Sequence, residues 1–189
     1  MQQNHSSLIL IVGVVSGLFL GINLTMAAGK KFETFDPESV RTWSFFSDGV
    51  MGGVSSGKAL LKKSGPDNFV RIQGNVSTDN NGGFIQIRHN LKKPLEDKIK
   101  GIRLKVRGNG ENYYIFIRTR STLLPWQFYN LEFPTSKKWS IVELQFIKFK
   151  RSSSFIRKTF KSSSIKSIGI VAYGRDHSAK VDISEIDFF

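Results

Sequence analysis

Trp43-Ser-Phe-Phe-Ser-Asp48-Gly49-Val50-Met51-Gly52-Gly53-Val54-Ser55-Ser56-Gly57 is the stretch that decides the fold, because it joins a short aromatic strand to a glycine-dense turn. A second stretch, Asn80-Asn81-Gly82-Gly83-Phe84-Ile85-Gln86-Ile87-Arg88, places a similar turn before a strand. Glycine alone takes positive φ or a close backbone approach without steric cost, so both turns are typical of shaped loops. Neither stretch contains a histidine or a cysteine that could act in catalysis. The two stretches therefore favour a binding or assembly protein over an enzyme.

Outward from these stretches, the chain is a series of short apolar-rich runs separated by turn signals. The alternation is clearest where Ile102, Leu104 and Val106 alternate with cationic residues, which predicts a strand with one apolar face. The pattern predicts an all-β fold over residues 29–189, a single antiparallel β-sandwich of jelly-roll type with about ten short strands. The segment Arg151–Ser164 breaks the rhythm and is predicted to be a long basic surface loop. The predicted strands are Trp43–Ser47, Lys58–Lys62, Phe69–Val76, Phe84–Asn90, Gly101–Arg107, Tyr113–Thr119, Trp126–Phe133, Trp139–Phe146, Ile165–Ala172 and Lys180–Phe188.

The composition is strongly basic. The chain has 189 residues and a formal net charge of +13, which attracts anionic partners such as nucleic acid, anionic lipid headgroups or an acidic protein face. Hydrophobic residues make up 40% of the chain, which indicates a folded domain with a hydrophobic core. The chain has no cysteine, so disulfides, thiol catalysis and cysteine-ligated zinc are excluded.

The N-terminal residues 1–28 form an uncharged apolar leader, with an almost unbroken apolar run from Leu8 to Ile22. The pattern predicts a signal peptide cleaved after Ala27 or Ala28, or alternatively an N-terminal membrane anchor, since Leu8 to Ala28 is long enough to span a bilayer. The expected location is therefore periplasmic or secreted, or anchored to the inner membrane. A mitochondrial presequence fits less well, because it should be Arg-rich and amphipathic.

Motifs for catalysis and metal binding are weak. Gly53-Val54-Ser55-Ser56-Gly57 matches the letters of the G-x-S-x-G nucleophile elbow, but a glycine turn precedes the serine and a short strand follows it. The isolated His89 and His177 are weak evidence for a metal. A calcium site built from Asp48, Asp79 and loop carbonyls is a chemically reasonable alternative. We predict no catalytic residue, no metal and no cofactor.

Basic residues gather in the predicted loop, and Arg151, Arg157, Lys158 and Lys161 are its candidate contact residues. An anionic membrane surface would suit them. Cations also alternate with aromatic residues in Tyr113–Arg120, a pattern that could stack bases while neutralising phosphates. We favour aromatic residues that fill the core and cations that face solvent, so nucleic acid is not the expected partner.

A set of motifs in a fixed order is similar to one known family. The matching blocks are Trp43 with Asp48-Gly49-Val50-Met51-Gly52-Gly53-Val54-Ser55, Asn81-Gly82-Gly83-Phe84 with Arg88, Gly101-Ile102-Arg103-Leu104-Lys105-Val106-Arg107-Gly108 with Tyr114 and Arg118, Gln127 with Phe133 and Trp139, and Ile165-Lys166-Ser167-Ile168-Gly169-Ile170. Over Phe35 to Phe189, the sequence resembles the complex I intermediate-associated protein 30 family. The resemblance implies a galactose-binding-type jelly roll. It also implies a non-enzymatic role as an assembly chaperone for respiratory complex I subunits.

The candidate binding surface follows from the two glycine turns. We expect Asp48, Met51, Asn81 and Arg88 to share one loop surface, with Asp48 and Asn81 capping turn amides or offering polar contacts and Met51 offering an adaptable apolar contact. The glycines that would shape its backbone are Gly52, Gly53, Gly82 and Gly83. The alternative is a carbohydrate-binding module of the envelope, which would need an exposed aromatic platform, with Trp126 or Tyr129 as candidates.

Overall fold

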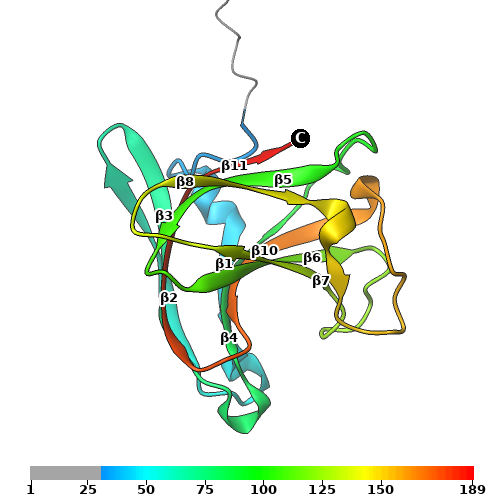
Figure 1. The fold of residues 1–189 in the computed structure, drawn as a ribbon, viewed down its shortest axis with the longest axis horizontal. Coiled ribbons are helices and arrows are strands. Elements are labelled where there is room, and N and C mark those ends of the chain that lie inside the picture. The colour runs from blue at the N-terminus through cyan, green and yellow to red at the C-terminus, as the bar shows by residue number, and fades with distance from the viewer. Residues whose placement is uncertain (1–30) are drawn as a thin grey trace, which may run out of the picture.

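Two antiparallel sheets packed face to face make up the computed structural model, which describes residues 31–189 (Figure 1). The six-stranded sheet has the order β1 (Trp43–Ser47), β4 (Phe84–Asn90), β10 (Ile165–Tyr173), β6 (Asn112–Thr119), β7 (Tyr129–Pro134) and β9 (Lys150–Arg151). The five-stranded sheet has the order β2 (Ser56–Ser64), β3 (Asp67–Val76), β11 (His177–Phe188), β5 (Gly101–Gly108) and β8 (Ser140–Gln145). The helical elements are the short 3₁₀ turns η1 (Ser39–Thr42), η2 (Asp48–Met51), η3 (Asp79–Asn81), η4 (Phe146–Lys148) and η5 (Ser162–Ser164).

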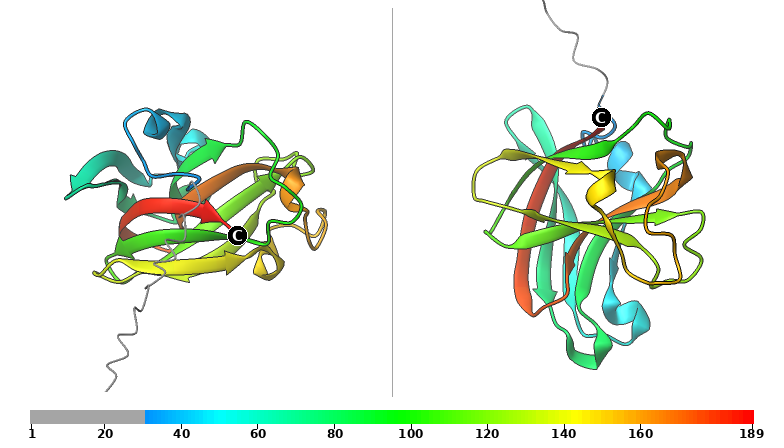
Figure 2. Two further views of the ribbon diagram at one scale, coloured as in Figure 1. Left: turned by 90° about the horizontal axis from the view of Figure 1, so that it is seen from above. Right: turned by 45° about the vertical axis from the view of Figure 1, so that its right-hand side comes forward.

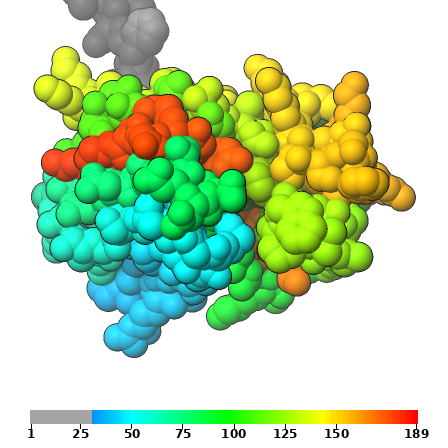
Figure 3. Space-filling model, turned by 90° about the horizontal axis from the view of Figure 1, so that it is seen from below, coloured from blue at the N-terminus to red at the C-terminus, as the bar shows by residue number. Residues whose placement is uncertain are grey.

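The ends of the described chain lie together, because Glu33 pairs with Ile186 of β11 (Figure 1). Figure 2 shows the two layers from above and in a view turned by 45° about the vertical axis. In the space-filling view of Figure 3, the loop near residue 125 and the loop near residue 155 form neighbouring protrusions on one side of the molecule. Both loops belong to the part of the six-stranded sheet that ends in β7 and β9.

The expected jelly-roll β-sandwich is confirmed, and its strands begin and end close to the predicted residues. The strand predicted over Trp126–Phe133 is wrong at its start, since β7 begins at Tyr129. The amide oxygen of Gln127 accepts hydrogen bonds from the backbone N–H groups of Leu123 and Leu124, at 2.9 and 3.1 Å, and so holds this segment as a turn. The two-residue strand β9, which ends at the first residue of the predicted loop, was not expected.

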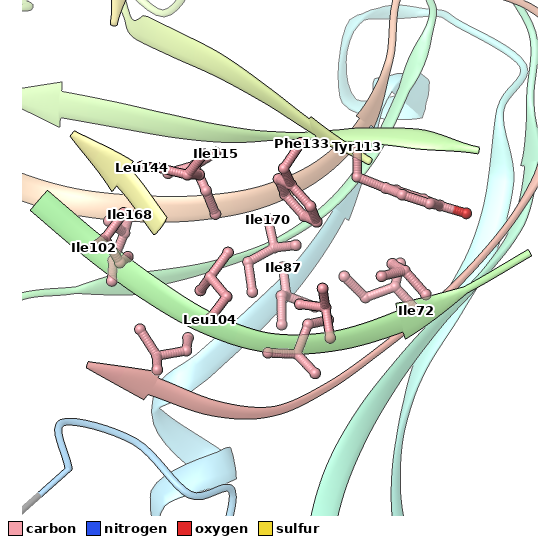
Figure 4. Packing of buried hydrophobic residues seen from close by; sticks show 14 of the residues in the cluster. Ile72, Ile87, Ile102, Leu104, Tyr113, Ile115, Phe133, Leu144, Ile168 and Ile170 are labelled. Atoms are coloured by element: carbon pink, nitrogen blue, oxygen red, sulfur yellow. The ribbon is translucent and has the colours of Figure 1, made fainter. Parts of the chain in front are cut away.

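Alternation along each strand builds the core. In β5, Ile102, Leu104 and Val106 are fully buried between the sheets, while the cations between them face outward (Figure 4). In β6, Tyr113, Ile115 and Ile117 are buried in the same way, so the residues between them lie on the outer face. In β10 the alternation of burial is less marked, because Val171 is buried as well as its neighbours Ile170 and Ala172, which pack in the core.

The outer face of the five-stranded sheet is electrically compensated. The buried carboxylate of Asp182 in β11 accepts hydrogen bonds from Arg71 in β3, at 2.7 and 2.8 Å, and from Arg107 in β5, at 2.8 Å. Further ion pairs on this face join Arg103 with Glu143, and Lys105 with both Asp67 and Glu185. Four cations of this sheet, Arg71, Arg103, Lys105 and Arg107, therefore have acidic partners within the chain.

The predicted leader, residues 1–28, lies outside the described residues. Within residues 31–189, no helix has the length and apolar character needed to cross a membrane.

Candidate functional site

A groove runs along β10 on the outer face of the six-stranded sheet. It forms because β10 carries small residues at its centre, Ser167 and Gly169, whereas the neighbouring strands carry large ones. Gly169 lies opposite Arg88 of β4 on one side and Phe116 of β6 on the other. The long side chains of the flanking strands become walls, and β10 becomes the floor between them. The hollow is visible in Figure 3, between the cyan and green segments and the yellow-green loop.

One end of the groove is aromatic and apolar. Phe116 and Phe128 stack with ring centroids 4.0 Å apart and an interplanar angle of 13°, and Tyr173 meets the Phe116 ring edge-on at 5.1 Å. Met51 and the exposed Trp126 also line this hollow. The hollow here has a volume of about 510 Å³. Stacked and edge-on aromatic rings of this kind offer a rigid apolar wall to a ligand.

The groove is cationic from Gly169 toward Ser167, because Arg88 lies across Gly169 from Phe116 and Arg118 lies beside Ser167. Arg88 and Arg118 line both the aromatic hollow and a second hollow of about 510 Å³, which Arg120 and Lys166 also line. Among residues 31–189, the Arg88 side chain has no hydrogen bond or ion pair and lies over the Phe46 ring at 4.4 Å. Burial, and after it the positive charge of Arg118, lowers the pKa of Arg88.

Arg118 has no acidic partner within the described part of the chain either, and its Nη2 donates to the carbonyl oxygens of Thr122, at 3.4 Å, and Leu124, at 3.0 Å. The two arginines are thus adjacent like charges without a carboxylate. This is the opposite of the arrangement around Asp182 on the other sheet. An anionic group on a ligand would relieve their repulsion.

Polar groups also reach the groove from its floor and its edge. The side chain of Gln86 lies across Gly169, since a Cβ on Gly169 would come within 2.9 Å of its amide oxygen. Asn81 lies at the edge, in the left-handed region with φ 59°. The neighbouring Asn80 donates from its amide to the carbonyl oxygen of Gly52 at 3.3 Å, which joins the two glycine turns. The groove therefore offers both apolar contact and hydrogen bonding.

Asp48 holds the two glycine turns together from behind. Its side chain is fully buried, and one carboxylate oxygen accepts a hydrogen bond from the Ser55 backbone at 2.9 Å. The other oxygen accepts from the Ser55 hydroxyl and the Gly83 N–H, both at 2.5 Å, and from the Phe84 N–H at 3.2 Å. Burial alone would raise the pKa of Asp48, but the hydrogen bonds from Gly83, Ser55 and Phe84 outweigh it and lower the pKa.

Two glycines make room for this carboxylate. A Cβ on Gly53 would lie 2.4 Å from Cγ of Asp48, and a Cβ on Gly82 would lie 2.4 Å from its Oδ2. Gly52 and Gly83 adopt positive φ, 88° and 122° respectively, which a residue with a side chain rarely adopts. The packing of the two turns around Asp48 places Met51 and Asn81 at the same edge of the groove.

Of the residues expected at the loop surface, some line the groove and others do not. Met51, Asn81, Gly82 and Arg88 line the groove. Asp48 lies behind the groove wall and contacts Gly53 and Gly83 there, while Gly52 forms the exposed corner of its turn. Sequence reasoning did not assign the groove residues Gln86, Phe116, Arg118, Phe128 and Tyr173.

The two candidates for an aromatic platform have different environments. Trp126 is exposed and lines the groove, whereas Tyr129 is fully buried in the core and is therefore wrong as a platform residue. The tyrosine faces inward because β7 begins there and its first side chain points between the sheets. Its hydroxyl donates to the carbonyl oxygen of Arg157 at 2.9 Å.

The four basic residues of the predicted loop lie outside both hollows of the groove. Arg157 and Lys158 are exposed, and neither makes an ion pair within residues 31–189. Arg151 donates from Nη1 to the carbonyl oxygens of Ser154 and Ile156 and so stabilises the loop. Lys161 is close enough to Asp97 for its charge to contribute to the lowered pKa of that carboxyl, after hydrogen bonding from Ser163.

The alternative catalytic and calcium sites have no support from the geometry. Ser55 is buried, and its hydroxyl is hydrogen-bonded to Asp48, so it is not presented as a nucleophile. Asp48 is already saturated by N–H and O–H donors, whereas a calcium ligand needs free oxygen lone pairs. Between residues 31 and 189, no group of three or more histidine, aspartate and glutamate side chains could hold a metal ion.

Family membership follows from the sequence of the folded part. Residues 32–183 match the family described as complex I intermediate-associated protein 30 (CIA30). The chain belongs to the CIA30 family. The match includes both glycine turns and every strand that contributes to the groove, and it confirms the resemblance drawn from the ordered motifs. No curated protein gives a significant match to the sequence of this CIA30 family member.

Solved structures with the same fold include carbohydrate-binding modules. The family 11 carbohydrate-binding module of the cellulosomal cellulase Lic26A-Cel5E of Clostridium thermocellum superposes with a TM-score of 0.70 at 15% identity, over 85% of this chain and 93% of that chain. The family 11 module from Clostridium thermocellum in complex with a β-1,3-1,4-mixed-linked tetrasaccharide gives 0.70 at 16% identity, over 85% and 94%. A family 30 carbohydrate-binding module gives 0.54 at 12% identity, over 72% and 91%. At these identities the likeness shows the jelly-roll β-sandwich alone.

Proposed function

We propose that this protein is a non-catalytic binding protein that holds a segment of a partner protein in the groove along β10, as an assembly factor. The observation that carries the proposal is the pair of uncompensated guanidinium groups, Arg88 and Arg118, beside an exposed apolar rim. Membership of the CIA30 family supports a partner among the subunits of respiratory complex I intermediates.

The chemistry of the groove favours a partner segment with two kinds of side chain. Val50, Met51 and Trp126 line the hollow and leave most of their surface exposed, so an apolar side chain placed there would bury area. The flexible thioether of methionine adapts to different apolar shapes. An acidic side chain near Gly169, across the floor from Phe116, would pair with Arg88, which has no carboxylate partner within residues 31–189. The expected ligand is therefore an extended segment that carries both apolar and acidic side chains.

The length of the groove suits such a segment. Its floor runs along β10 from Ser167 to Tyr173, and six residue steps at about 3.3 Å each give a length of about 20 Å. An extended peptide of about six residues spans that distance.

Affinity capture of the tagged full-length protein from membranes of its own host, after mild crosslinking, tests the proposal. We expect subunits of a respiratory complex in the wild-type capture and about tenfold less of them with Arg88→Gln, because loss of a partly buried charged contact costs at least a factor of ten in affinity. The matched control is Lys62→Gln, which removes an exposed cation from β2 in the other sheet. Mass spectrometry of the captured protein also reports whether residues 1–28 remain.

Equal recovery of these subunits with all three proteins would contradict the assignment of the groove. Recovery of no respiratory subunit at all would contradict the assembly role. The two outcomes can be told apart, because a captured protein that is not a respiratory subunit could still be lost on Arg88→Gln.

A carbohydrate is the second candidate ligand, and one observation favours it. The Phe116–Phe128 stack and Tyr173 form an aromatic wall beside the hydrogen-bonding side chains of Gln86 and Arg88. A sugar ring needs both an apolar face to lie against and polar groups for its hydroxyls. Saturable binding to a glycan on a broad panel, lost on Phe116→Ala, would support this function, and the absence of any glycan ligand would reject it.

A further inference from the structure

Two neighbouring loops expose large apolar side chains on one side of the molecule. The loop between β6 and β7 exposes 81% of Leu123 and 62% of Trp126, and the loop after β9 exposes 92% of Phe155. Figure 3 shows these loops as adjacent protrusions, in yellow-green and yellow-orange. Large apolar side chains that protrude together usually mark a contact with a partner or a membrane. We call these two loops the apolar tip.

The exposure of Phe155 is imposed by the contacts around it. Ser152 ties the second loop to the first, since its N–H donates to the Phe128 carbonyl at 2.9 Å and its hydroxyl donates to the Trp126 carbonyl at 2.7 Å. On the other side of Phe155, Ile156 is buried in the core. Arg151 bridges the loop by donating to the carbonyls of Ser154, at 3.1 Å, and Ile156, at 2.8 Å. The aromatic ring is thus presented outward by a loop that is anchored at both ends.

The charge around the apolar tip is of one sign. Residues 112–131 and 144–175 contain no aspartate or glutamate. Arg157 and Lys158 follow Phe155 almost directly, are exposed and make no ion pair within the described chain. Acidic residues do contact the C-terminal end of this loop, since the Glu96 carbonyl accepts from Ser162 and Asp97 lies beside Lys161.

We propose that the apolar tip docks on an anionic lipid bilayer, with Phe155 inserted at the headgroup boundary and Arg157 and Lys158 against the headgroups. Apolar side chains that protrude from convex loops, surrounded by unpaired cations, match an interface that is anionic outside and apolar within. A protein partner would instead require a shaped and acidic counter-surface. The inference goes beyond the proposed function, because Phe155, Arg157 and Lys158 line neither hollow of the groove.

A fluorophore attached at the apolar tip tests this directly. The chain has no cysteine, so Phe155→Cys and Leu61→Cys each give a single labelling site in the full-length protein. Leu61 is partly exposed on β2, at the side of the molecule away from the tip (Figure 1). The protein labelled with an environment-sensitive dye is mixed with vesicles of phosphatidylcholine alone, or of phosphatidylcholine with about one third phosphatidylserine. The label reports contact at its own position, whether or not residues 1–28 also bind the vesicle.

We expect the dye at position 155 to shift to the blue and to brighten at least about twofold with the anionic vesicles, and the dye at position 61 to remain unchanged. Adding R157E and K158E should raise the lipid concentration for half-maximal response by at least about tenfold. The control substitutions K62E and K63E, on β2, should leave it within about twofold. No response at position 155, the same response at both positions, or an equal effect of both charge reversals would overturn the proposal.

Discussion

At the scale of single residues, one buried carboxylate explains why the two glycine stretches occur in the same chain. Asp48 accepts hydrogen bonds from Ser55 in its own turn and from Gly83 and Phe84 in the other. Gly53 and Gly82 have no side chain because the carboxylate occupies that space. The glycines that looked like features of a binding surface therefore serve chiefly to bring two loops together around one charge.

Replacing this carboxylate by an amide should destabilise the protein. Asp48→Asn keeps the shape of the side chain, but its NH₂ group faces buried N–H donors and can accept none of their hydrogen bonds. We expect a loss of about 2–4 kcal/mol in the free energy of unfolding, measured with urea at pH 7. The control is Asp79→Asn, at an exposed residue of the neighbouring turn, which should change it by no more than about 0.5 kcal/mol. Equal stability of Asp48→Asn and wild type would contradict the role of Asp48.

The lowered pKa of Asp48 predicts how the stability of the protein depends on pH. Hydrogen bonds lower the pKa of Asp48 in the folded protein, so the unfolded chain takes up a proton first as the pH falls. The stabilisation is therefore complete above the unfolded-state pKa of about 3.9 and is lost as the pH drops through the folded-state pKa. Urea unfolding at pH 7, 4 and 3 should show a smaller loss for Asp48→Asn than for wild type. Parallel losses would show that Asp48 does not contribute.

At the scale of the strands, the groove is a product of register. Gly169 at the centre of β10 lies between Arg88 of β4 and Phe116 of β6, so a strand with small outward side chains is flanked by two with large ones. Inward residues of the same strands, such as Ile87 and Ile115, fill the core. The alternation that stabilises the sandwich thus also selects the side chains of the site.

Filling the floor of the groove should block binding and spare the fold. In Gly169→Val, the added Cβ meets the end of the flexible Gln86 side chain, at 2.9 Å from its amide oxygen, and Gln86 can turn away. We expect partner capture to fall about tenfold or more, while the free energy of unfolding changes by less than about 2 kcal/mol. Asn112→Val adds the same side chain at an exposed end of β6, outside both hollows, and should leave capture intact. Full capture by Gly169→Val would show that the ligand lies elsewhere.

Local sequence patterns predicted the strands well because alternation and turn residues are local signals. They also placed Met51, Asn81 and Arg88 at the site, since these residues flank the glycine turns. Phe116 and Tyr173 were not assigned, because β6, β10 and β4 are neighbours in the sheet but distant in sequence. Strand order of that kind depends on long-range pairing, which a periodic pattern does not specify.

The turn over residues 126–128 was mistaken for a strand for a different reason. Its aromatic composition favours a strand, but the side chain of Gln127 satisfies the N–H groups of Leu123 and Leu124. A side chain that caps the backbone overrides local strand preference. Because the chain turns here, Trp126 lies at the rim of the groove.

At the scale of the whole molecule, the positive charge is unevenly compensated. On the outer face of the five-stranded sheet, Arg71 and Arg107 share the carboxylate of Asp182. On the six-stranded sheet, Arg88 and Arg118 have no acidic partner within residues 31–189, and the apolar tip lies in an acid-free part of the sequence. Uncompensated cations therefore lie beside the groove and the apolar tip, where they attract anionic partners.

The groove along β10 is the central claim, and site-specific photocrosslinking in the native host tests it most directly. A photoreactive phenylalanine analogue replaces Tyr173 at the aromatic end of the groove, or Ile141 on β8 of the other sheet as the control. We predict a discrete adduct with a subunit of a respiratory complex from position 173, absent from position 141 and abolished by Arg88→Gln. No protein adduct from position 173, or the same adducts from both positions, would contradict the claim that this groove holds a protein partner.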